Sequence, residues 1–330
     1  MNLRDGVVFS FDCKLESPFH TTQREYRNLL KCAPFIAGTS LRGAILKALI
    51  ELNCKNNINK LKSLSSYQEI KKFHSNCHED CPVRHFFDAQ KTNAVFSCGT
   101  LMGDLRYDLF TRIALTKDSR SAADGMIVNA ECISSGVGFQ FSISLFDDAI
   151  DTVDKLKNAL DLASKNGIGR FKSIGFGRFK IKSVGETEVG DLVYHKVDEI
   201  ESDNSRVEIG LRTPFIFNNS QEAFDTKNLG DVFSTLFNKR YDDICVDGMV
   251  EPLSISSTEM RLIPEFINRY SYEIGKKEIR LSAGIESRFW LEFDEVTEDV
   301  KSQLAVGSSF GIGVWCNCGF GVFSTRHQDE

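Results

Sequence analysis

Apolar and polar side chains alternate along the start of the chain. Val7, Phe9, Phe11, Cys13 and Leu15 are apolar, and polar residues occupy positions 10, 12, 14 and 16. Because the side chains of a strand point alternately to its two faces, this pattern predicts a half-buried β-strand. One face of that strand would pack on a hydrophobic core, and the other would face water.

A helical pattern follows the first strand. Leu41, Ile45 and Leu49 recur at the spacing that places them on one face of an α-helix. Thr39 and Ser40 stand just before this apolar face and can accept hydrogen bonds from the free N–H groups at a helix start. The sequence therefore predicts a helix that one of these two side chains caps.

The remainder of the first half combines further strands with one more helix. Strand patterns occupy residues 126–133 and 139–146, on either side of a Ser-Ser-Gly turn. Helical spacing covers residues 151–164, and a last strand spans residues 175–184. The order strand, helix, strand, strand, helix, strand is that of a ferredoxin-like domain.

The second half repeats this order more loosely. A first strand contains residues 207–211, and helices are expected over residues 229–237 and 296–304. Strand lies within residues 279–293, and a closing strand spans residues 313–324. The pattern therefore favours a second domain of the same kind.

The same glycine-rich phrase closes each half. Residues 167–179 and 311–323 share seven of 13 positions, in the pattern G-I-G-x5-G-F-G-x-F. The shared glycines are Gly167, Gly169, Gly175 and Gly177 in the first copy and Gly311, Gly313, Gly319 and Gly321 in the second. Such a repeat indicates a duplicated domain, and the polar stretch 198–205 marks the boundary. We therefore predict an α+β fold of two tandem ferredoxin-like (RRM-like) domains, residues 1–197 and 206–330.

The two glycine-rich phrases differ in charge. Glycines let another backbone or a ligand approach closely. The first copy also carries Arg170, Lys172 and Arg178, whereas the second has no basic residue. If either loop touches a polyanion, the first is the better candidate, and the apolar second loop suits contact with protein.

Composition and charge narrow the function classes. A chain of 330 residues is long enough for two domains, and its net charge of −6 argues against general coating of nucleic acid but allows a local basic groove. No run is long and apolar enough to span a bilayer, and the first residues do not begin a signal peptide. Ten cysteines without a secretory signal imply reduced thiols, so we expect a cytoplasmic protein with no membrane partner.

Four segments resemble the RAMP proteins of CRISPR–Cas effector complexes. Residues 33–44 resemble the motif P-x-I-P-G-[ST]-S-L-[RK]-G, with Ala37 in place of the second proline, and G-F-G-R-F resembles the glycine-rich loop that closes RAMP domains. Residues 112–125 are similar to the segment of type III backbone subunits whose β-hairpin "thumb" enters the guide–target duplex. Residues 81–88 look like the C-P-V-C-x-L-F-G element of those subunits. The two-domain arrangement looks most like the paired-RAMP subunits of type III-D complexes.

The resemblance implies a role in RNA-guided antiviral defence. A first RAMP domain, with an inserted cysteine–histidine segment and a thumb-like hairpin, would be followed by a second RAMP domain. Its partners would be guide RNA, target RNA and other effector subunits. A guide of changing sequence has to be held by its backbone, which calls for basic side chains along a groove. The candidates are Arg42, Lys47, Arg112, Lys117, Arg120, Arg170, Lys172 and Arg178. The alternative is that they are ordinary solvated surface charges.

The cysteine–histidine segment is a candidate site for structural zinc. Zinc takes four tetrahedral nitrogen or sulfur ligands and can stabilise a poorly structured insertion. The candidate ligands are His74, Cys77, Cys81 and His85. Arg84 stands where the family element has its third cysteine, so His85 or His78 would have to replace it. Cys54 and Cys98 are candidates from elsewhere in the chain, and the alternative is a metal-free loop.

Catalysis is predicted to be absent. Target-cleaving RAMP subunits use an aspartate in the loop after the first strand, but residues 17–34 contain Glu25 and no aspartate. His20, with Arg24 and Tyr26 nearby, could instead act as the general base of a guide-processing nuclease. We expect a non-catalytic RNA-binding structural subunit. The alternatives are a RAMP endoribonuclease that uses His20 or Glu25, and a duplicated ferredoxin-like binding protein unrelated to CRISPR.

Overall fold

The structure is a computed structural model. It describes residues 2–26, 28–54, 81–86, 92–115, 122–200, 205–217, 229–246, 251–271 and 276–325. In the first half the elements are β1 (Gly6–Leu15), β2 (Thr22–Tyr26), β3 (Leu29–Cys32), α1 (Gly38–Asn53), η1 (Pro82–Phe86), β4 (Ala94–Phe96), β5 (Thr100–Met102), β6 (Tyr107–Leu115), β7 (Ala122–Ile133), β8 (Gly138–Phe146), η2 (Asp147–Thr152), α4 (Val153–Asn166), η3 (Lys172–Ile174) and β9 (Phe179–Glu188). In the second half they are α5 (Val189–Asp198), β10 (Arg206–Leu211), β11 (Phe215–Ile216), α6 (Leu229–Ile244), β12 (Ser257–Arg261), β13 (Pro264–Ser271), β14 (Lys276–Ala283), β15 (Arg288–Glu292), α7 (Glu298–Phe310), η4 (Cys316–Cys318) and β16 (Phe323–Ser324).

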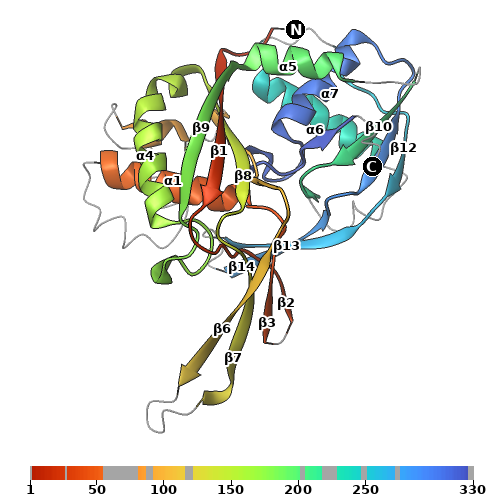
Figure 1. Ribbon diagram of the computed structural model, residues 1–330. Coiled ribbons are helices and arrows are strands. Elements are labelled where there is room, and N and C mark those ends of the chain that lie inside the picture. Colours follow the sequence, from red (N-terminus) through yellow and green to blue (C-terminus); the bar gives the residue numbers. More distant parts are fainter. Residues whose placement is uncertain are drawn as a thin grey trace.

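The first half is built on an antiparallel sheet in the order β4-β8-β1-β9, to which β5 adds by pairing with β8. Helices α1 and α4 pack together beside this sheet (Figure 1). β1 buries the alternating apolar side chains from Phe9 to Leu15, and Leu41, Ile45 and Leu49 of α1 are fully buried in the same core. The predicted half-buried strand, the predicted apolar helix face and the α+β class are therefore confirmed.

The second half has a matching sheet in the order β12-β15-β10-β16, also antiparallel. Val207, Ile209 and Leu211 of β10 are buried, as their alternation predicts. Phe233 of α6 packs edge-on against Phe289 of β15, with ring centroids 5.0 Å apart. In each sheet the first strand of that half lies in the middle. β1 pairs with β8 and β9, and β10 pairs with β15 and β16.

Each half also carries a β-hairpin inserted between the second and third strands of its sheet. In the first half, β6 and β7 pair along their length and project from the body, with β2 and β3 beside them in the order β2-β3-β7-β6 (Figure 1). A hairpin therefore stands where the sequence resembles the thumb segment, and residues 116–121, with Lys117 and Arg120, lie outside the described residues. In the second half, β13 and β14 pair, and β11 joins them. The sequence patterns did not reveal this second hairpin.

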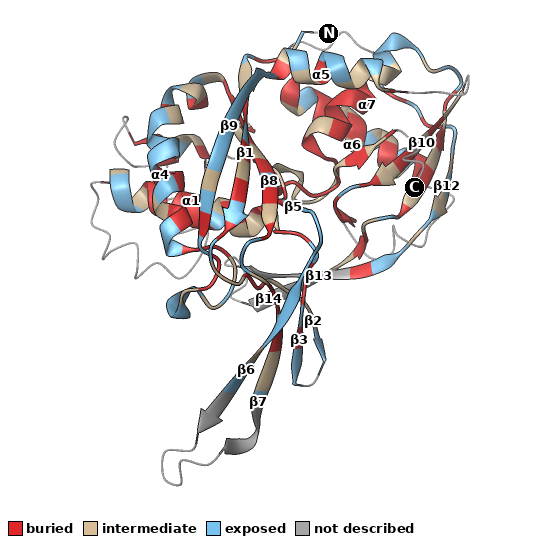
Figure 2. Ribbon diagram, in the orientation of Figure 1, coloured by how far each residue is buried: buried red, intermediate tan, exposed pale blue. Residues whose placement is uncertain are grey.

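The two halves share a hydrophobic core. Val8, Val95 and Phe146 lie on the face of the first sheet opposite its helices, and they belong to the core of the second half. The ring of Phe146 packs edge-on against that of Phe310 in α7, at a centroid distance of 5.7 Å. Figure 2 shows buried residues in β1, β8, α6 and α7, whereas most of β9 and most of residues 107–112 of β6 are exposed.

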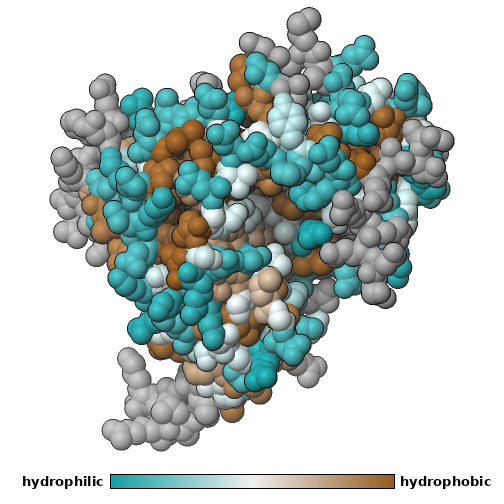
Figure 3. All heavy atoms as spheres, turned by 45° about the horizontal axis from the view of Figure 1, so that its top comes forward, coloured by the Kyte–Doolittle hydropathy of each residue, from teal (hydrophilic) through white to brown (hydrophobic). Residues whose placement is uncertain are grey.

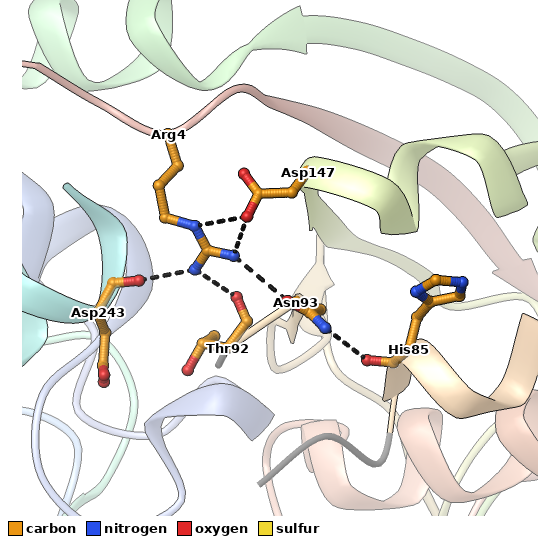
Figure 4. Close-up of polar contacts among 6 residues, drawn as sticks. All are labelled: Arg4, His85, Thr92, Asn93, Asp147 and Asp243. Carbon is orange, nitrogen blue, oxygen red and sulfur yellow. Dashed lines mark hydrogen bonds and ion pairs between the residues drawn. The ribbon is translucent and has the colours of Figure 1, made fainter. Parts of the chain in front are cut away.

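A buried arginine reinforces this junction (Figure 4). Arg4 is 8% exposed, and its guanidinium forms an ion pair with Asp147 of η2 at 2.7 Å. It also donates to the carbonyl oxygens of Thr92 at 2.9 Å and Asp243 at 2.8 Å, and to the side chain of Asn93 at 3.3 Å. A buried charge requires such partners to offset its desolvation. Because Asp243 lies in α6 and the other partners lie in the first half, Arg4 connects the two halves.

Several element boundaries differ from those that the sequence predicted. Ala37 is the N-cap of α1 and no side chain caps it, so Thr39 and Ser40 lie inside the helix. The first closing strand begins at Phe179 rather than at residue 175, and the second comprises only β16. In both cases the glycines hold a turn, not a strand. The helix α5 was not predicted.

The surface is that of an ordinary globular protein. Hydrophilic side chains cover most of the face in Figure 3, and hydrophobic ones form separate patches. Among the described helices, none combines the length and the apolar character that crossing a membrane requires.

Candidate nucleic-acid interface

The two glycine-rich loops have the same backbone structure. The N–H of Gly177 donates to the Pro18 carbonyl at 2.8 Å, and that of Gly321 donates to the Pro214 carbonyl at 2.9 Å. All eight shared glycines have positive φ. A Cβ on Gly177 would lie 1.9 Å from the carbonyl oxygen of Ile168, and a Cβ on Gly321 would meet Ile312 at the same distance. Only glycine fits these positions, so the repeat is a structural requirement of the fold.

A second repeated motif holds each loop in place. Leu15 to Phe19 and Leu211 to Phe215 share the pattern L-x-[ST]-P-F. The Ser17 hydroxyl accepts from the backbone N–H of Arg178 at 2.8 Å, and the Thr213 hydroxyl accepts from that of Val322 at 2.9 Å. This motif was not among the predicted features, although the sequence displays it.

An aromatic residue in each loop adopts a left-handed conformation. Phe171 has φ 63° and Trp315 has φ 62°, in equivalent positions of the two copies. Such a conformation is rare and unfavourable for an aromatic residue. Two guanidiniums lie over the Phe171 ring, Arg112 of β6 at 5.4 Å and Arg170 of the loop at 5.7 Å. The hairpin and the first loop therefore bring two arginines together on one ring.

A chain of hydrogen bonds positions Arg170. Its guanidinium donates to the hydroxyl of Thr22 at 2.9 Å, and that oxygen lies 2.9 Å from Nε2 of His20. Nδ1 of His20 lies 2.6 Å from the carbonyl oxygen of Glu131. Since a carbonyl only accepts, Nδ1 carries the proton and Nε2 accepts from Thr22. Arg170 is also 3.8 Å from the carboxylate of Glu25, an exposed ion pair.

The side chain of His20, which holds Arg170 in place through Thr22, is buried. Its side chain is fully buried and packs against Phe171, with ring centroids 5.3 Å apart. Burial lowers the pKa of His20, the hydrogen bond to the Glu131 carbonyl partly opposes that effect, and the charge of Arg170 lowers the pKa further. Both ring nitrogens are already hydrogen-bonded within the protein. The imidazole is therefore neutral and positions Arg170 through Thr22.

The other predicted RNA-binding residues lie around the first loop and on α1. Lys172 and Arg178 are exposed. Partial desolvation of the ammonium lowers the pKa of Lys172, and the nearby charge of Lys47 lowers it further. Lys47 is itself exposed and lies 3.8 Å from Glu51. Arg42 makes protein contacts, since it donates to the carbonyl of Phe86 at 2.9 Å.

The second loop lies against the first half of the same chain. Cys318 and Phe320 form a buried cluster with Ala33, Phe35 and Cys98. This loop does contact protein, as its apolar composition suggested, but its partner is the chain itself.

The candidate zinc ligands are only partly covered by the structure. His74 and Cys77 lie outside the described residues. Cys81 is buried in the first core, and His85 is half-buried, with its carbonyl accepting from Asn93 at 3.2 Å (Figure 4). Within the described ranges, no three His, Cys, Asp or Glu side chains gather as a metal site. The zinc site stays a prediction.

Comparison with known proteins supports one family. The family model of the RAMP superfamily matches residues 12–180. A structure titled "Cryo-EM structure of the Type III-B Cmr-beta bound to cognate target RNA" is similar at 14% identity with a TM-score of 0.38, covering 56% of this chain and 61% of that one, which is less than two thirds of its length. Cmr6 from Pyrococcus furiosus is similar at 14% identity with a TM-score of 0.37, covering 54% of this chain and 98% of that one. No curated protein gives a significant match. Because the family match spans more than half of the 330 residues, the chain belongs to the RAMP superfamily.

Proposed function

We propose that this chain is a non-catalytic, RNA-binding structural subunit of a type III CRISPR effector complex. Membership of the RAMP superfamily supports the proposal, as do the four segments that resemble type III subunits. Guide RNA, target RNA and other effector subunits would be its partners, and the cytoplasm its place of action. The paired domains favour a type III-D-like subunit.

The observation that carries this proposal is the convergence of Arg112 and Arg170 on Phe171. Both guanidiniums lie beside this ring, where their positive charges can attract an anion. RNA offers a phosphate at every nucleotide, and a guide of variable sequence has to be held through its backbone. Phe171 fixes both guanidiniums where the hairpin meets the loop. We infer that RNA lies along this junction, with Arg178 of the loop as a further contact.

Two ferredoxin-like RAMP domains, 1–197 and 206–330, would form the scaffold. Support comes from the corresponding order of the two sheets and from the equivalent glycine loops. The inserted hairpins then stand in the same place in both domains. The first loop has arginines in its own sequence, at positions 170 and 178, and the second loop has none.

The absence of catalysis is supported by the state of the two candidate residues. His20 is buried, with both ring nitrogens hydrogen-bonded inside the protein, and Glu25 is an exposed partner of Arg170. A general base needs access to the proton it removes. The same contacts give both residues a role in positioning Arg170.

We also propose that His74, Cys77, Cys81 and His85 hold a structural zinc ion. The proposal rests on the spacing of four nitrogen and sulfur ligands in a short insertion. Zinc would supply folding energy to this segment and take no part in chemistry.

Salt-dependent RNA binding tests the function. Each phosphate contact lowers the slope of log K against log salt by roughly one unit, so Arg112→Ala with Arg170→Ala should weaken binding and flatten the slope by about two units. The matched control, Lys165→Ala with Arg261→Ala, removes two exposed cations from α4 and β12. We expect the control to bind as the wild type does. An unchanged slope in a folded Arg112/Arg170 variant would contradict the proposed junction.

A further inference from the structure

The tips of the two glycine loops share a fold but differ in what they touch. The tip of the second loop, η4, is inserted into the first half, where a Cβ on Gly319 would lie 2.2 Å from the backbone nitrogen of Cys98. Among the described residues, the equivalent Gly175 next to η3 meets the guanidinium of Arg178 alone, at 4.0 Å. Cys318 is 5% exposed, whereas its counterpart Ile174 is 52% exposed. The first tip thus lacks the cover that the second tip has.

The surface that receives the second tip has a definite chemistry. It consists of the start of α1 and the segment that follows β4. A Cβ on Gly38, the first residue of α1, would lie 2.1 Å from the carbonyl oxygen of Cys318 and 2.9 Å from that of Phe96. The guanidinium of Arg42, one turn along α1, lies 4.0 Å from the Cys318 sulfur. Such an acceptor therefore needs glycine at the start of the helix.

We propose that the tip of the first loop, Lys172 to Ile174, docks into the equivalent acceptor of a different RAMP subunit. The partner would present a helix that starts with glycine, as α1 does at Gly38, beside the end of its second sheet strand. The contact between the halves of this chain would then be repeated between chains, in a head-to-tail sense. This proposal rests on the proposed function, because it requires a complex of several RAMP subunits.

A second copy of this chain does not fit the partner's role. The acceptor at α1 is already filled by the chain's own second loop. In the second half, the corresponding helix is α6, and a Cβ on its Gly230 would lie 2.8 Å from the carbonyl oxygen of Ile255. The chain's own segment therefore covers that place as well. The tip needs a partner whose acceptor is open.

The side chains of the first tip suit a contact between separate chains. Ile174 provides one exposed apolar anchor, and Lys172 stands where the buried second loop has Cys316. Interfaces between separate chains combine an apolar centre with a polar rim. Arg170 donates to Thr22, beside the hairpin, so the docking of Ile174 does not use the side chain that carries the proposed RNA junction.

Site-specific crosslinking in the assembled effector complex tests the proposal. A photoreactive amino acid at position 174 should crosslink to the peptide of another RAMP subunit that contains its helix-starting glycine. Changing that glycine to leucine should abolish the crosslink. Tyr194 of α5, which is also exposed, is the control position. Crosslinks from position 174 to RNA or to this chain, or none above the control, would overturn the proposal.

A binding measurement separates this proposal from the function on which it rests. After nuclease treatment, Ile174→Ser should weaken association with the crosslinked subunit at least about tenfold, whereas Tyr194→Ser should not. Neither variant loses a charge, so RNA binding by the isolated chain should stay unchanged. If the isolated wild-type chain does not bind RNA, the proposed RNA-binding function is refuted and the docking result still stands. Equal affinities of the two serine variants would refute the docking.

Discussion

The contact between the second loop and α1 predicts opposite effects for two glycines of one helix. Gly38 and Gly43 lie five residues apart in α1, within the segment G-T-S-L-R-G. A Cβ on Gly38 would collide with the backbone of Cys318, whereas a Cβ on Gly43 has no atom within 4 Å. Gly38→Ala and Gly43→Ala therefore add the same methyl group to the same helix, but only the first one meets the other half of the chain.

The expected magnitudes follow from these distances. At Gly38 the obstructing atoms belong to backbone, which cannot rotate away, so the loop has to move by more than about 1 Å, and overpacking of this kind costs about 1–3 kcal/mol. At Gly43, an open position inside the helix, alanine should stabilise the protein by about 0.5–1 kcal/mol, because glycine loses more backbone entropy on folding. The two variants should therefore differ in the free energy of unfolding by about 1.5–4 kcal/mol.

Scanning calorimetry measures the difference directly. With an unfolding entropy of about 2.1 cal/mol/K per residue, a chain of 330 residues gives about 0.7 kcal/mol/K, so the melting temperatures should differ by about 2–6 °C. The calorimetric and van't Hoff enthalpies also show whether the two halves unfold together. Gly38→Ala melting at or above the wild-type temperature would refute the contact between the second loop and α1.

Three further predictions concern metal, chemistry and pH. Protein purified without chelator should contain about one zinc per chain, and Cys77→Ser with Cys81→Ser should remove it and lower the melting temperature; metal-free wild type would contradict the zinc site. Labelled repeat RNA and guide-matched target RNA should stay uncut by the assembled complex at this subunit, with or without magnesium, and cuts that vanish in His20→Ala or Glu25→Ala would contradict the non-catalytic role. Because burial lowers the pKa of His20, the unfolded chain takes up this proton first, so stability should fall as the pH drops below about 6.5. His20→Ile, which copies Ile216 at the equivalent position of the second half, should flatten that dependence of the unfolding free energy on pH, and an unchanged profile would refute the burial of His20.

Local patterns in the sequence predicted the elements that local physics determines. The alternation from Val7 to Leu15 and the apolar face of α1 are properties of neighbouring residues, and the structure confirms both. The repeat L-x-[ST]-P-F was equally visible, and together with the glycine phrase it would have indicated how each loop is held. The closing strands were predicted too long because the glycines of the loops, which look compatible with a sheet edge, adopt positive φ and form turns.

The contacts that define the candidate site are long-range, and local patterns carry no information about them. Arg112 and Phe171 are 59 positions apart, and they meet only because the hairpin β6–β7 folds back onto the loop. His20 and Glu131 are 111 positions apart, so the sequence indicated a possible general base at His20 and not its support of Arg170. The second hairpin was missed because β13 shows no clean alternation, although Ile279, Leu281 and Ala283 alternate in β14.

The difference in charge between the two loops follows from their surroundings. The glycines are kept in both copies because the backbone fold fails without them, as the 1.9 Å contacts of Gly177 and Gly321 require. The side chains between the glycines are free to differ. In the second copy the tip packs against the first half, and positions 316 and 322 are half-buried, so a charge there would lose part of its hydration. In the first copy Lys172 and Arg178 are exposed, so they keep more of their hydration and carry their charge at a smaller cost. The two loops therefore share one backbone fold. The tip of the second loop is buried, and the first loop, whose tip is exposed, carries the basic residues of the proposed RNA contact.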